Sequence, residues 1–221
     1  MAVALACLLV VAGYLVGSIP FAIVVGKWLW HVDVRLHGSG NVGTTNVFRV
    51  LGRKAGTLVL VGDMGKGFLP VAVAILVFPG WAAWYPVIVG LAALLGHMYS
   101  VFLRGAGGKG VATGAGVILA LMPEVFVISL AAFLVVLFVS RIVSLASIVA
   151  ALTFACATVA LGKPLPYMVL GVLATAVVIY AHRANIRRIA LRCENRVTFP
   201  WEHRSSGSPP AAGDRPSIGA S

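Results

Sequence analysis

The sequence predicts an all-α integral membrane protein with about seven transmembrane helices. Hydrophobic residues make up 60% of the 221 residues and charged residues only 10%, whereas soluble proteins average about 25% charged residues. Long apolar segments alternate with short polar connections, and a helix needs about 20 apolar residues to cross a membrane. The net charge of +11 lies mostly in those connections and near the C-terminus. Because this is the pattern of the positive-inside rule, we predict no nucleic-acid partner.

The first apolar segment, 3–26, is interrupted by Gly17, Ser18 and Pro20. A membrane helix tolerates such a break when its neighbours satisfy the freed backbone groups. The later segments are 56–78, 81–103, 111–121, 125–140, 143–161 and 166–181. Segment 111–121 is too short to cross a core of about 30 Å, so a re-entrant half-helix is the alternative for it. We expect one transmembrane domain over 1–202 and a disordered tail, rich in Ser, Pro and Gly, over 203–221.

The distribution of basic residues predicts the orientation of the chain. With the N-terminus outside and an odd number of spans, the turns near 79, 122 and 162 lie outside and carry only Lys163. The basic connections then share the cytoplasmic side, together with the C-terminus. They are 27–55, 104–110, Arg141 and the region from 182 onward. Every glycine-rich polar stretch therefore falls on one face of the membrane.

The longest polar run in the first half of the chain is 38–49, GSGNVGTTNVFR, which contains no carboxylate. Glycines let backbone N–H groups approach a ligand closely, and a guanidinium suits a phosphate. We therefore predict an anion-binding loop. Its expected contributors are Gly38, Ser39, Gly40, Asn41, Gly43, Thr45, Asn46 and Arg49. The glycine spacing also fits a dinucleotide fingerprint, but no βαβ unit surrounds it.

A second glycine loop, Gly107-Gly108-Lys109-Gly110, opens segment 111–121. Backbone N–H groups at a helix start, with a lysine beside them, favour a phosphate. Gly110 stands where a Walker A motif requires Ser or Thr, so that motif is excluded. Taken alone, the loop could equally be a flexible connector whose lysine marks the inner face of the membrane.

Further polar residues lie near the inner ends of the later segments. His182 and Asn185 are spaced i, i+3 and face the same way, either toward a site or as a capping pair. Ser144 offers a hydroxyl near the same face, and its alternative role is helix capping. Asp63 and Lys66, also i, i+3, are predicted to form a structural pair facing the protein interior.

The sequence predicts neither a metal centre nor a cofactor. The six acidic residues are scattered, and the three cysteines show no spacing typical of metal ligands or disulfides. His97 is predicted to be a packed or hydrogen-bonded histidine. No histidine adjoins the hydroxyl-rich loop, so a nucleophile triad is not expected either.

The motifs in this order resemble the PlsY family of bacterial acyl-phosphate:glycerol-3-phosphate acyltransferases. They are GSGNxGxTNxxR at 38–49, DxxKG at 63–67, GH at 96–97, GGKGVAT at 107–113 and HxxNIxR at 182–188. The resemblance covers about residues 10 to 190. This chain departs from the family's usual residues at Ala184, where a glutamate is common, and at Ser100 and Thr44.

The resemblance implies a seven-helix protein of the bacterial inner membrane whose active site faces the cytoplasm. The domain over 1–202 would transfer a fatty acyl group from acyl phosphate to the 1-hydroxyl of glycerol 3-phosphate, giving lysophosphatidic acid and phosphate. It also implies that Ser39, Arg49, Lys109, His182 and Asn185 are catalytic, and that Ser144 lines the site. Expected partners are the two substrates, membrane lipids and the enzyme that makes acyl phosphate.

The residues themselves agree with this chemistry, because both substrates carry phosphate and one needs an apolar groove. An acyl phosphate is already activated, so positioning and charge stabilisation remain for the protein. The proton of the attacking hydroxyl would go to the donor's own phosphate, or else to His182. The competing hypothesis is a transporter for small phosphorylated solutes, which predicts access from both faces.

Overall fold

The structure, a computed structural model, describes residues 1–198, and every regular element in this part of the chain is helical. The α-helices are α1 Ala2–Ser18, α2 Phe21–Trp30, α3 Thr44–Val77, α4 Trp84–Met98, α5 Val111–Leu121, α6 Pro123–Ser140, α7 Val143–Ala160, α8 Leu165–Ala181 and α9 Arg183–Ala190. Two 3-10 turns are η1 Val34–Leu36 and η2 Val101–Leu103. The all-α prediction is confirmed for these residues. The end of the predicted domain, 199–202, and the predicted tail, 203–221, lie outside the described residues.

Within residues 1–198, four helical stretches are long and apolar enough to cross a membrane: α3, α4 continued through η2, α6 and α7. The bent pairs α1–α2, at 46°, and α8–α9, at 61°, raise this number to six. The 11-residue α5 is shorter than a span, as its sequence indicated. The structure therefore supports four to six spans, and the seventh span and the orientation of the termini stay predictions.

The predicted polar loop over 27–55 is wrong at both ends. Helix α2 continues to Trp30 and ends with His31 in the left-handed conformation. Helix α3 already begins at Thr44, so only 31–43 separates the two helices. Polar side chains do not prevent a helix that extends beyond the apolar layer, and hydropathy alone therefore misplaced these ends. Gly52, with φ 80° and ψ −170°, marks a kink within α3.

The break between α1 and α2 is stabilised by side chains from other helices. Pro20 has no N–H to continue the hydrogen-bond pattern, which leaves carbonyl groups at the end of α1 unpaired within the helix. The Lys66 ammonium donates to the Ile19 carbonyl at 2.8 Å, and the Ser100 hydroxyl donates to the Ser18 carbonyl at 2.6 Å. The neighbours thus satisfy the freed backbone, as predicted for this interruption.

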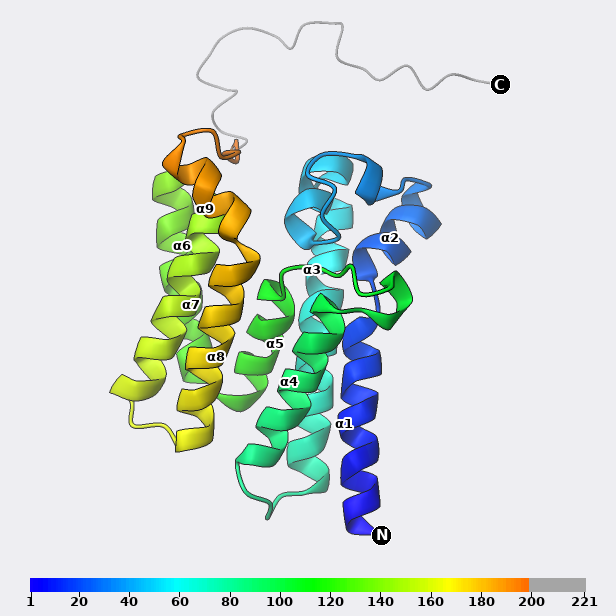
Figure 1. The fold of residues 1–221 in the computed structure, drawn as a ribbon, viewed down its shortest axis with the longest axis vertical. Helices are drawn as coiled ribbons and strands as arrows, with labels where there is room; N and C mark the ends of the chain where they lie inside the picture. Colours follow the sequence, from blue (N-terminus) through cyan, green and yellow to red (C-terminus); the bar gives the residue numbers. More distant parts are fainter. Residues whose placement is uncertain (199–221) are drawn as a thin grey trace, which may run out of the picture.

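Helix α5 packs between α3 and the later helices (Figure 1). Glycines allow this close contact: a Cβ added at Gly67 of α3 would lie 2.1 Å from the Thr113 carbonyl oxygen of α5. A Cβ added at Gly116 of α5 would lie 2.0 Å from the Met64 carbonyl oxygen of α3. Small residues of this kind let membrane helices meet backbone to backbone. Their role here is to hold the glycine loop before α5 against α3.

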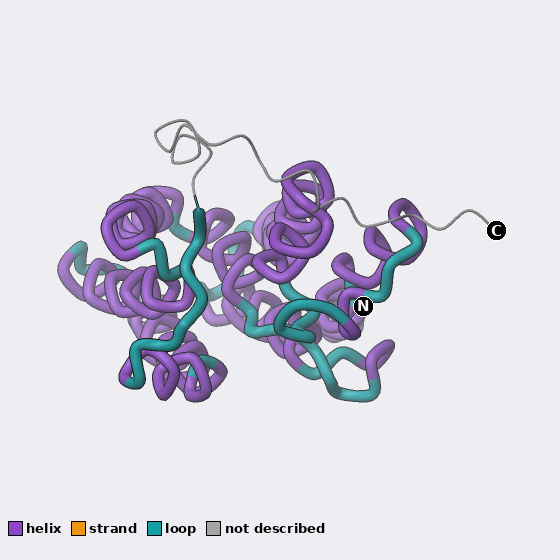
Figure 2. The backbone as a smooth tube through the Cα atoms, turned by 90° about the horizontal axis from the view of Figure 1, so that it is seen from above, coloured by secondary structure: helices purple, strands orange, loops and turns teal. Residues whose placement is uncertain are grey.

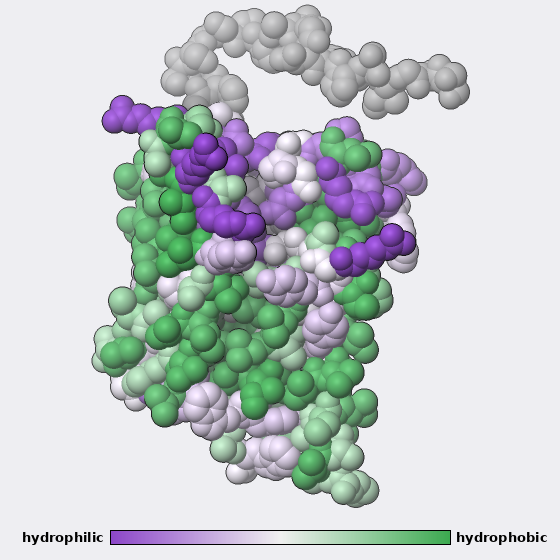
Figure 3. Space-filling view, viewed as in Figure 1, coloured by the Kyte–Doolittle hydropathy of each residue, from purple (hydrophilic) through white to green (hydrophobic). Residues whose placement is uncertain are grey.

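One of the buried apolar clusters joins α3, α4 and α5 to α6, α7 and α8. Its fully buried members include Val71 of α3, Met122 and Val125 at the start of α6, and Phe154 of α7. The view from above shows helices seen nearly end-on with the connecting segments over them (Figure 2). Polar residues gather at the end of the molecule opposite the N-terminus, and a broad apolar surface lies below them (Figure 3).

Candidate functional site

One buried amide connects the loop between α2 and α3 to the start of α3. Asn46, in the first turns of α3 and only 2% exposed, accepts a hydrogen bond from the Ser39 backbone N–H at 2.9 Å. Its amide nitrogen donates to the carbonyls of Val34, at 2.9 Å, and His37, at 3.2 Å. The side chain therefore folds 34–39 back onto the start of α3. In the structure Asn46 shapes the loop, and direct phosphate contact by this residue stays a prediction.

Two glycines give the loop its bend. Gly38 and Gly40 have φ of 62° and 69°, in the left-handed region that L side chains rarely adopt. A Cβ at Gly38 would also lie 2.4 Å from the Asn46 side-chain oxygen. Ser39 lies between these glycines, and its residue is exposed. The loop thus presents the Ser39 hydroxyl on a strongly curved backbone.

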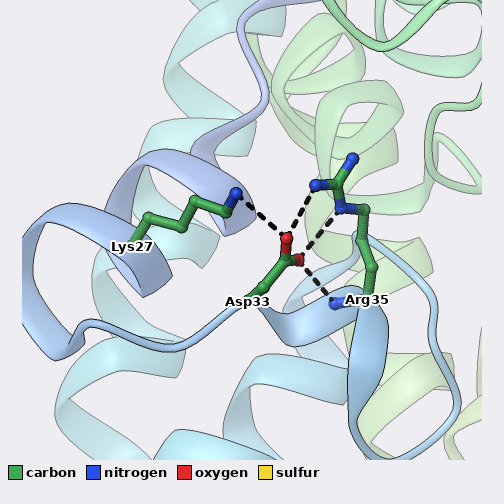
Figure 4. Close-up of polar contacts among 3 residues, drawn as sticks. All are labelled: Lys27, Asp33 and Arg35. Carbon is green, nitrogen blue, oxygen red and sulfur yellow. Dashed lines mark hydrogen bonds and ion pairs between the residues drawn. The ribbon is translucent and has the colours of Figure 1, made fainter.

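Asp33 fixes the entry to this loop (Figure 4). Its carboxylate accepts hydrogen bonds from the Arg35 backbone N–H at 3.1 Å and from the Arg35 guanidinium at 2.9 and 2.6 Å. Lys27 of α2 lies 3.1 Å from the same carboxylate. The Arg35 hydrogen bonds hold the pKa of Asp33 well below its usual range, although partial burial opposes them. Asp33 therefore stays ionised and links α2 to η1.

The other predicted residues of the first motif surround the start of α3. Gly43 is the N-cap of the helix, and Asn41 and Thr45 are partly exposed beside it. Arg49 is exposed about one turn into α3. Within residues 1–198 its guanidinium makes no hydrogen bond or ion pair, so its N–H donors are unused there.

A second cluster brings together residues that lie far apart in the sequence. The Lys109 ammonium donates to the Asn185 side-chain oxygen at 2.5 Å. The Asn185 amide nitrogen donates to Glu194 at 2.6 Å, and the Ser144 hydroxyl donates to the same carboxylate oxygen at 2.8 Å. The structure thus joins three predicted site residues, Lys109, Ser144 and Asn185, through a fourth that the sequence analysis missed.

Glu194 was counted among the scattered acids, yet it is the carboxylate that completes this cluster. Its second oxygen accepts from the Arg188 guanidinium at 2.6 Å. Burial raises the pKa of Glu194, but hydrogen bonds from Asn185, Ser144 and Arg188 lower it more, so the net shift is downward. The sequence feature that could have identified Glu194 is its position as a lone acid directly after the basic run over 183–192.

His182 lies at the bend between α8 and α9 and is 3% exposed. Its Nδ1 is 2.8 Å from the Val178 carbonyl oxygen. Because a carbonyl can only accept, Nδ1 carries the proton in this contact and a neutral ring keeps the lone pair on Nε2. His182 lies three residues before Asn185, whose side chain belongs to the Lys109 cluster.

The second glycine loop rests on His97. The backbone N–H groups of Gly107 and Gly108 donate to the carbonyls of Met98, at 3.0 Å, and His97, at 3.1 Å. A Cβ at Gly108 would lie 2.3 Å from His97 Nε2. Burial lowers the pKa of Lys109, which follows in the loop; Glu194 raises it and Arg188 lowers it, and the net shift is downward.

Below this loop lies the predicted Asp63 and Lys66 pair. The two charges are 2.7 Å apart with side chains 2% exposed, and His97 Nδ1 lies 3.7 Å from the same carboxylate oxygen. The structure thus confirms a buried pair facing the interior. A cavity of about 10 Å³ beside it is lined by Lys66, His97, Gly108 and Val42. It has room for about one water, and its lining shows that the two glycine loops adjoin each other.

In Figure 1 the α2–α3 loop, the segment before α5 and helix α9 all lie in the half of the molecule away from the N-terminus, and Figure 3 shows polar residues gathering at that end. The residues joined by hydrogen bonds form two sets, Ser39 with Asn46 and Lys109 with Ser144, Asn185 and Glu194. Within residues 1–198, the Arg49 guanidinium makes no hydrogen bond or ion pair to either set. Gly110, at the end of the second loop, has φ 81° and is buried beside Leu94. Among the described residues, no three His, Cys, Asp or Glu side chains are grouped to hold a metal ion.

A profile of the family described as glycerol-3-phosphate acyltransferase matches residues 7–192. The chain belongs to this family. It is 47% identical over 193 residues to the glycerol-3-phosphate acyltransferase of Geobacillus kaustophilus (strain HTA426), covering 87% of this chain and 96% of the relative. It is 46% identical over 188 residues to the enzyme of that name from Myxococcus xanthus (strain DK1622), covering 85% and 97%. The resemblance found in the sequence is thereby confirmed.

Two solved structures of PlsY, an integral membrane glycerol 3-phosphate acyltransferase, share the fold. The glycerol 3-phosphate form has a TM-score of 0.83 and 44% identity, covering 87% of this chain and 96% of that one. The lysophosphatidic acid form has a TM-score of 0.82 and 43% identity, covering 87% and 95%. The polar end described above therefore belongs to a glycerol-3-phosphate acyltransferase fold.

Proposed function

We propose that this family member transfers a fatty acyl group from acyl phosphate to the 1-hydroxyl of glycerol 3-phosphate. The products are lysophosphatidic acid and inorganic phosphate. The observation that carries the proposal is the meeting of two glycine loops and the Lys109 cluster at the polar end of an apolar bundle. This end offers hydrogen-bond donors to two phosphates. The apolar surface beside it can be reached by an acyl chain from the lipid. The glycerol 3-phosphate and lysophosphatidic acid forms of PlsY support the choice of acceptor and product.

The catalytic roles are assigned to Ser39, Arg49, Lys109, His182 and Asn185. Lys109 and Arg49 would hold phosphate oxygens, because a guanidinium binds two at once and an ammonium binds as a point charge. Ser39 and Asn185 add neutral hydrogen-bonding groups. The binding set around them is Gly38, Gly40, Asn41, Gly43, Thr45, Asn46, Gly107, Gly108, Gly110 and Ser144.

The reaction needs no covalent enzyme intermediate. The glycerol hydroxyl oxygen attacks the acyl carbon, and the bond from that carbon to the phosphate oxygen breaks. The electron pair leaves with the phosphate, which takes the hydroxyl proton, so an ester and inorganic phosphate result. The unprotonated Nε2 of His182 is the alternative acceptor of that proton, since its Nδ1 proton is held by Val178. The protein supplies positioning and charge stabilisation.

The identity of the acyl donor tests the proposal. Purified protein is given glycerol 3-phosphate with either palmitoyl phosphate or palmitoyl-CoA, and lysophosphatidic acid is measured. We expect product from palmitoyl phosphate, because the short loops contain no visible adenine-binding module. Product from the CoA ester alone would overturn the proposed donor. The enzyme that makes acyl phosphate would be the functional partner, and it could supply the donor through the membrane surface.

We further propose that the polar end faces the cytoplasm at the bacterial inner membrane. The natural Cys193 is exposed just after α9 and reports on this end. In a chain lacking Cys7 and Cys156, a membrane-impermeant maleimide added to intact cells should not label Cys193. A matched chain with Gly80→Cys in the α3–α4 turn, where nothing lies within 4 Å of the new Cβ, should be labelled. The reverse pattern would invert the topology.

A further inference from the structure

Glu194 is the one carboxylate of the Lys109 cluster, and it lies beyond residue 192, where the match to the family profile ends. Its side chain is 7% exposed. It accepts hydrogen bonds from Ser144 of α7 and from Asn185 and Arg188 of α9, at 2.6 to 2.8 Å. A buried carboxylate with three donors from two helices is fully ionised and firmly held.

The backbone on both sides of Glu194 is also fixed. The Cys193 N–H donates to the Arg188 carbonyl at 2.9 Å, at the end of α9. The Val197 N–H donates to the Arg141 carbonyl at 2.8 Å, in the turn between α6 and α7. The segment 191–198 therefore crosses from α9 to the α6–α7 turn with Glu194 pointing inward.

The chemistry of the neighbours determines how the Asn185 amide must lie. An ammonium can only donate, so Lys109 requires the amide oxygen of Asn185. An ionised carboxylate can only accept, so Glu194 requires the amide nitrogen. Lys109, 2.5 Å from the amide oxygen, and Glu194, 2.6 Å from the amide nitrogen, therefore favour the same orientation of the Asn185 amide. Without Glu194, the amide could turn and point its N–H groups at the Lys109 ammonium.

We propose that Glu194 is a positioning residue of the acyl transfer: it orients the Asn185 amide and thereby holds Lys109 where substrate phosphate binds. The role of Lys109 in binding phosphate rests on the function proposed above. Glu194 also supplies the negative charge that balances the two cations in contact with the cluster, Lys109 and Arg188. Within residues 1–198, Glu194 and Arg188 influence the pKa of Lys109, and Lys109 influences the pKa of His182.

The test compares three variants with the wild-type chain: Glu194→Ala, Glu194→Gln and the control Glu124→Gln. Glu124 pairs with Lys163 at the opposite end of the bundle, so its loss removes a paired carboxylate away from the site. Glycerol 3-phosphate affinity is measured by calorimetry on detergent-purified protein from pH 7 to 11. Thermal unfolding of each variant is recorded in parallel.

We expect Glu194→Ala to weaken glycerol 3-phosphate binding about tenfold or more, because charge-assisted hydrogen bonds are among the stronger ones in proteins. Glu194→Gln keeps the shape and an acceptor for Asn185, so its loss at neutral pH should be smaller. It removes the negative charge that supports the Lys109 ammonium, so the alkaline midpoint of binding should move to lower pH. Glu124→Gln should leave affinity and midpoint at the wild-type values.

The proposal is overturned if Glu194→Ala binds within twofold of wild type, or if Glu194→Gln keeps the wild-type alkaline midpoint. A lowered melting temperature with both binding readouts unchanged would mean that Glu194 only fastens the segment 191–198. Binding is measured without any acyl donor, so failure of the palmitoyl phosphate assay would reject the proposed donor and leave this result standing.

Discussion

The loop over 31–43 and the cluster around Lys109 lie at the same end of the molecule but are held by contacts of very different range. Asn46 secures the loop through partners 7 to 12 residues away in the sequence. Lys109 and Asn185 are 76 residues apart, and Ser144 and Glu194 are 50 apart. The hydrogen bonds of the first region therefore lie within one short stretch of the chain. Those of the second depend on the packing of α7, α9 and the loop before α5.

The two regions should therefore respond differently to mutation. A change in the loop should damage the loop alone, since its hydrogen bonds close on themselves. A change in the cluster should be felt by residues from several helices. The predictions below use this contrast, from the largest expected effect to the smallest.

Arg49 should show the largest effect, because it is the permanent cation of the first motif and its donors are unused within residues 1–198. Arg49→Lys keeps the charge but loses the paired geometry, and should lower kcat/KM roughly ten- to hundredfold. Arg49→Ala should lose more while the protein still inserts and purifies. Initial rates of lysophosphatidic acid formation at matched protein levels provide the measurement.

Arg53→Ala is the matched control, because Arg53 is an exposed arginine one turn further along α3. It should retain nearly full activity. Equal, mild losses in all three variants would show that Arg49 only marks the inner face of the membrane, and that phosphate binding belongs to the Lys109 cluster alone.

Asn46→Ala should have the second-largest effect on activity. It removes three hydrogen bonds, one from the Ser39 N–H and two to the carbonyls of Val34 and His37, and a typical hydrogen bond contributes about 0.5–1.5 kcal/mol net. We expect kcat/KM to fall at least about tenfold, as the loop that presents Ser39 loosens. Because the contacts are local, the thermal unfolding of the bundle should change little.

The exposed Asn195 provides the control for this change. Asn195→Ala removes an amide of the same size without a side-chain hydrogen bond among the described residues, and should be neutral. If Asn46→Ala lowered the melting temperature strongly but spared kcat/KM, the loop would be part of the bundle's stability rather than of the site.

Gly108→Ala should have a moderate effect on the second region. The new Cβ would lie 2.3 Å from His97 Nε2, so either the loop before Lys109 or the His97 ring must shift. Overpacking of this kind costs about 1–3 kcal/mol, which corresponds to a loss of roughly tenfold if it falls on substrate binding. The measurement is the KM for glycerol 3-phosphate.

Gly65→Ala in α3 is the companion variant, because nothing lies within 4 Å of its added Cβ. It should leave KM unchanged and leave stability equal or slightly higher, since alanine favours a helix. A Gly108→Ala protein with wild-type KM would show that the glycine loop does not place Lys109.

The smallest effect is a shift in pH dependence. Burial lowers the pKa of Lys109 below the ordinary 10.5 of lysine. The ammonium is present below that lowered pKa and is lost as pH rises through it, so glycerol 3-phosphate affinity should fall at lower pH than for an ordinary lysine. Lys109→Arg keeps its charge to higher pH and should move this fall upward. Affinity profiles that fall at the same pH in both proteins would exclude Lys109 as the titrating group.

The sequence by itself determined the membrane class, the helical fold and the family. Hydropathy acts locally along the chain, so seven apolar segments could be recognised before any contact was known. The first glycine loop could also be recognised, because Gly38, Gly40 and Asn46 act within one short stretch. Hydropathy misplaced the ends of α2 and α3, since polar residues can continue a helix beyond the apolar layer.

Only the tertiary structure decided which remote residues meet. Nothing in the chain order shows that Glu194 reaches Ser144 and Asn185, or that Gly108 rests on His97 above the Asp63 and Lys66 pair. These contacts arise because α3 and α5 approach through glycines and because the segment after α9 returns to the α6–α7 turn. The physical reason is that side-chain pairing across a bundle depends on helix packing, which residue types and spacing along one helix do not specify.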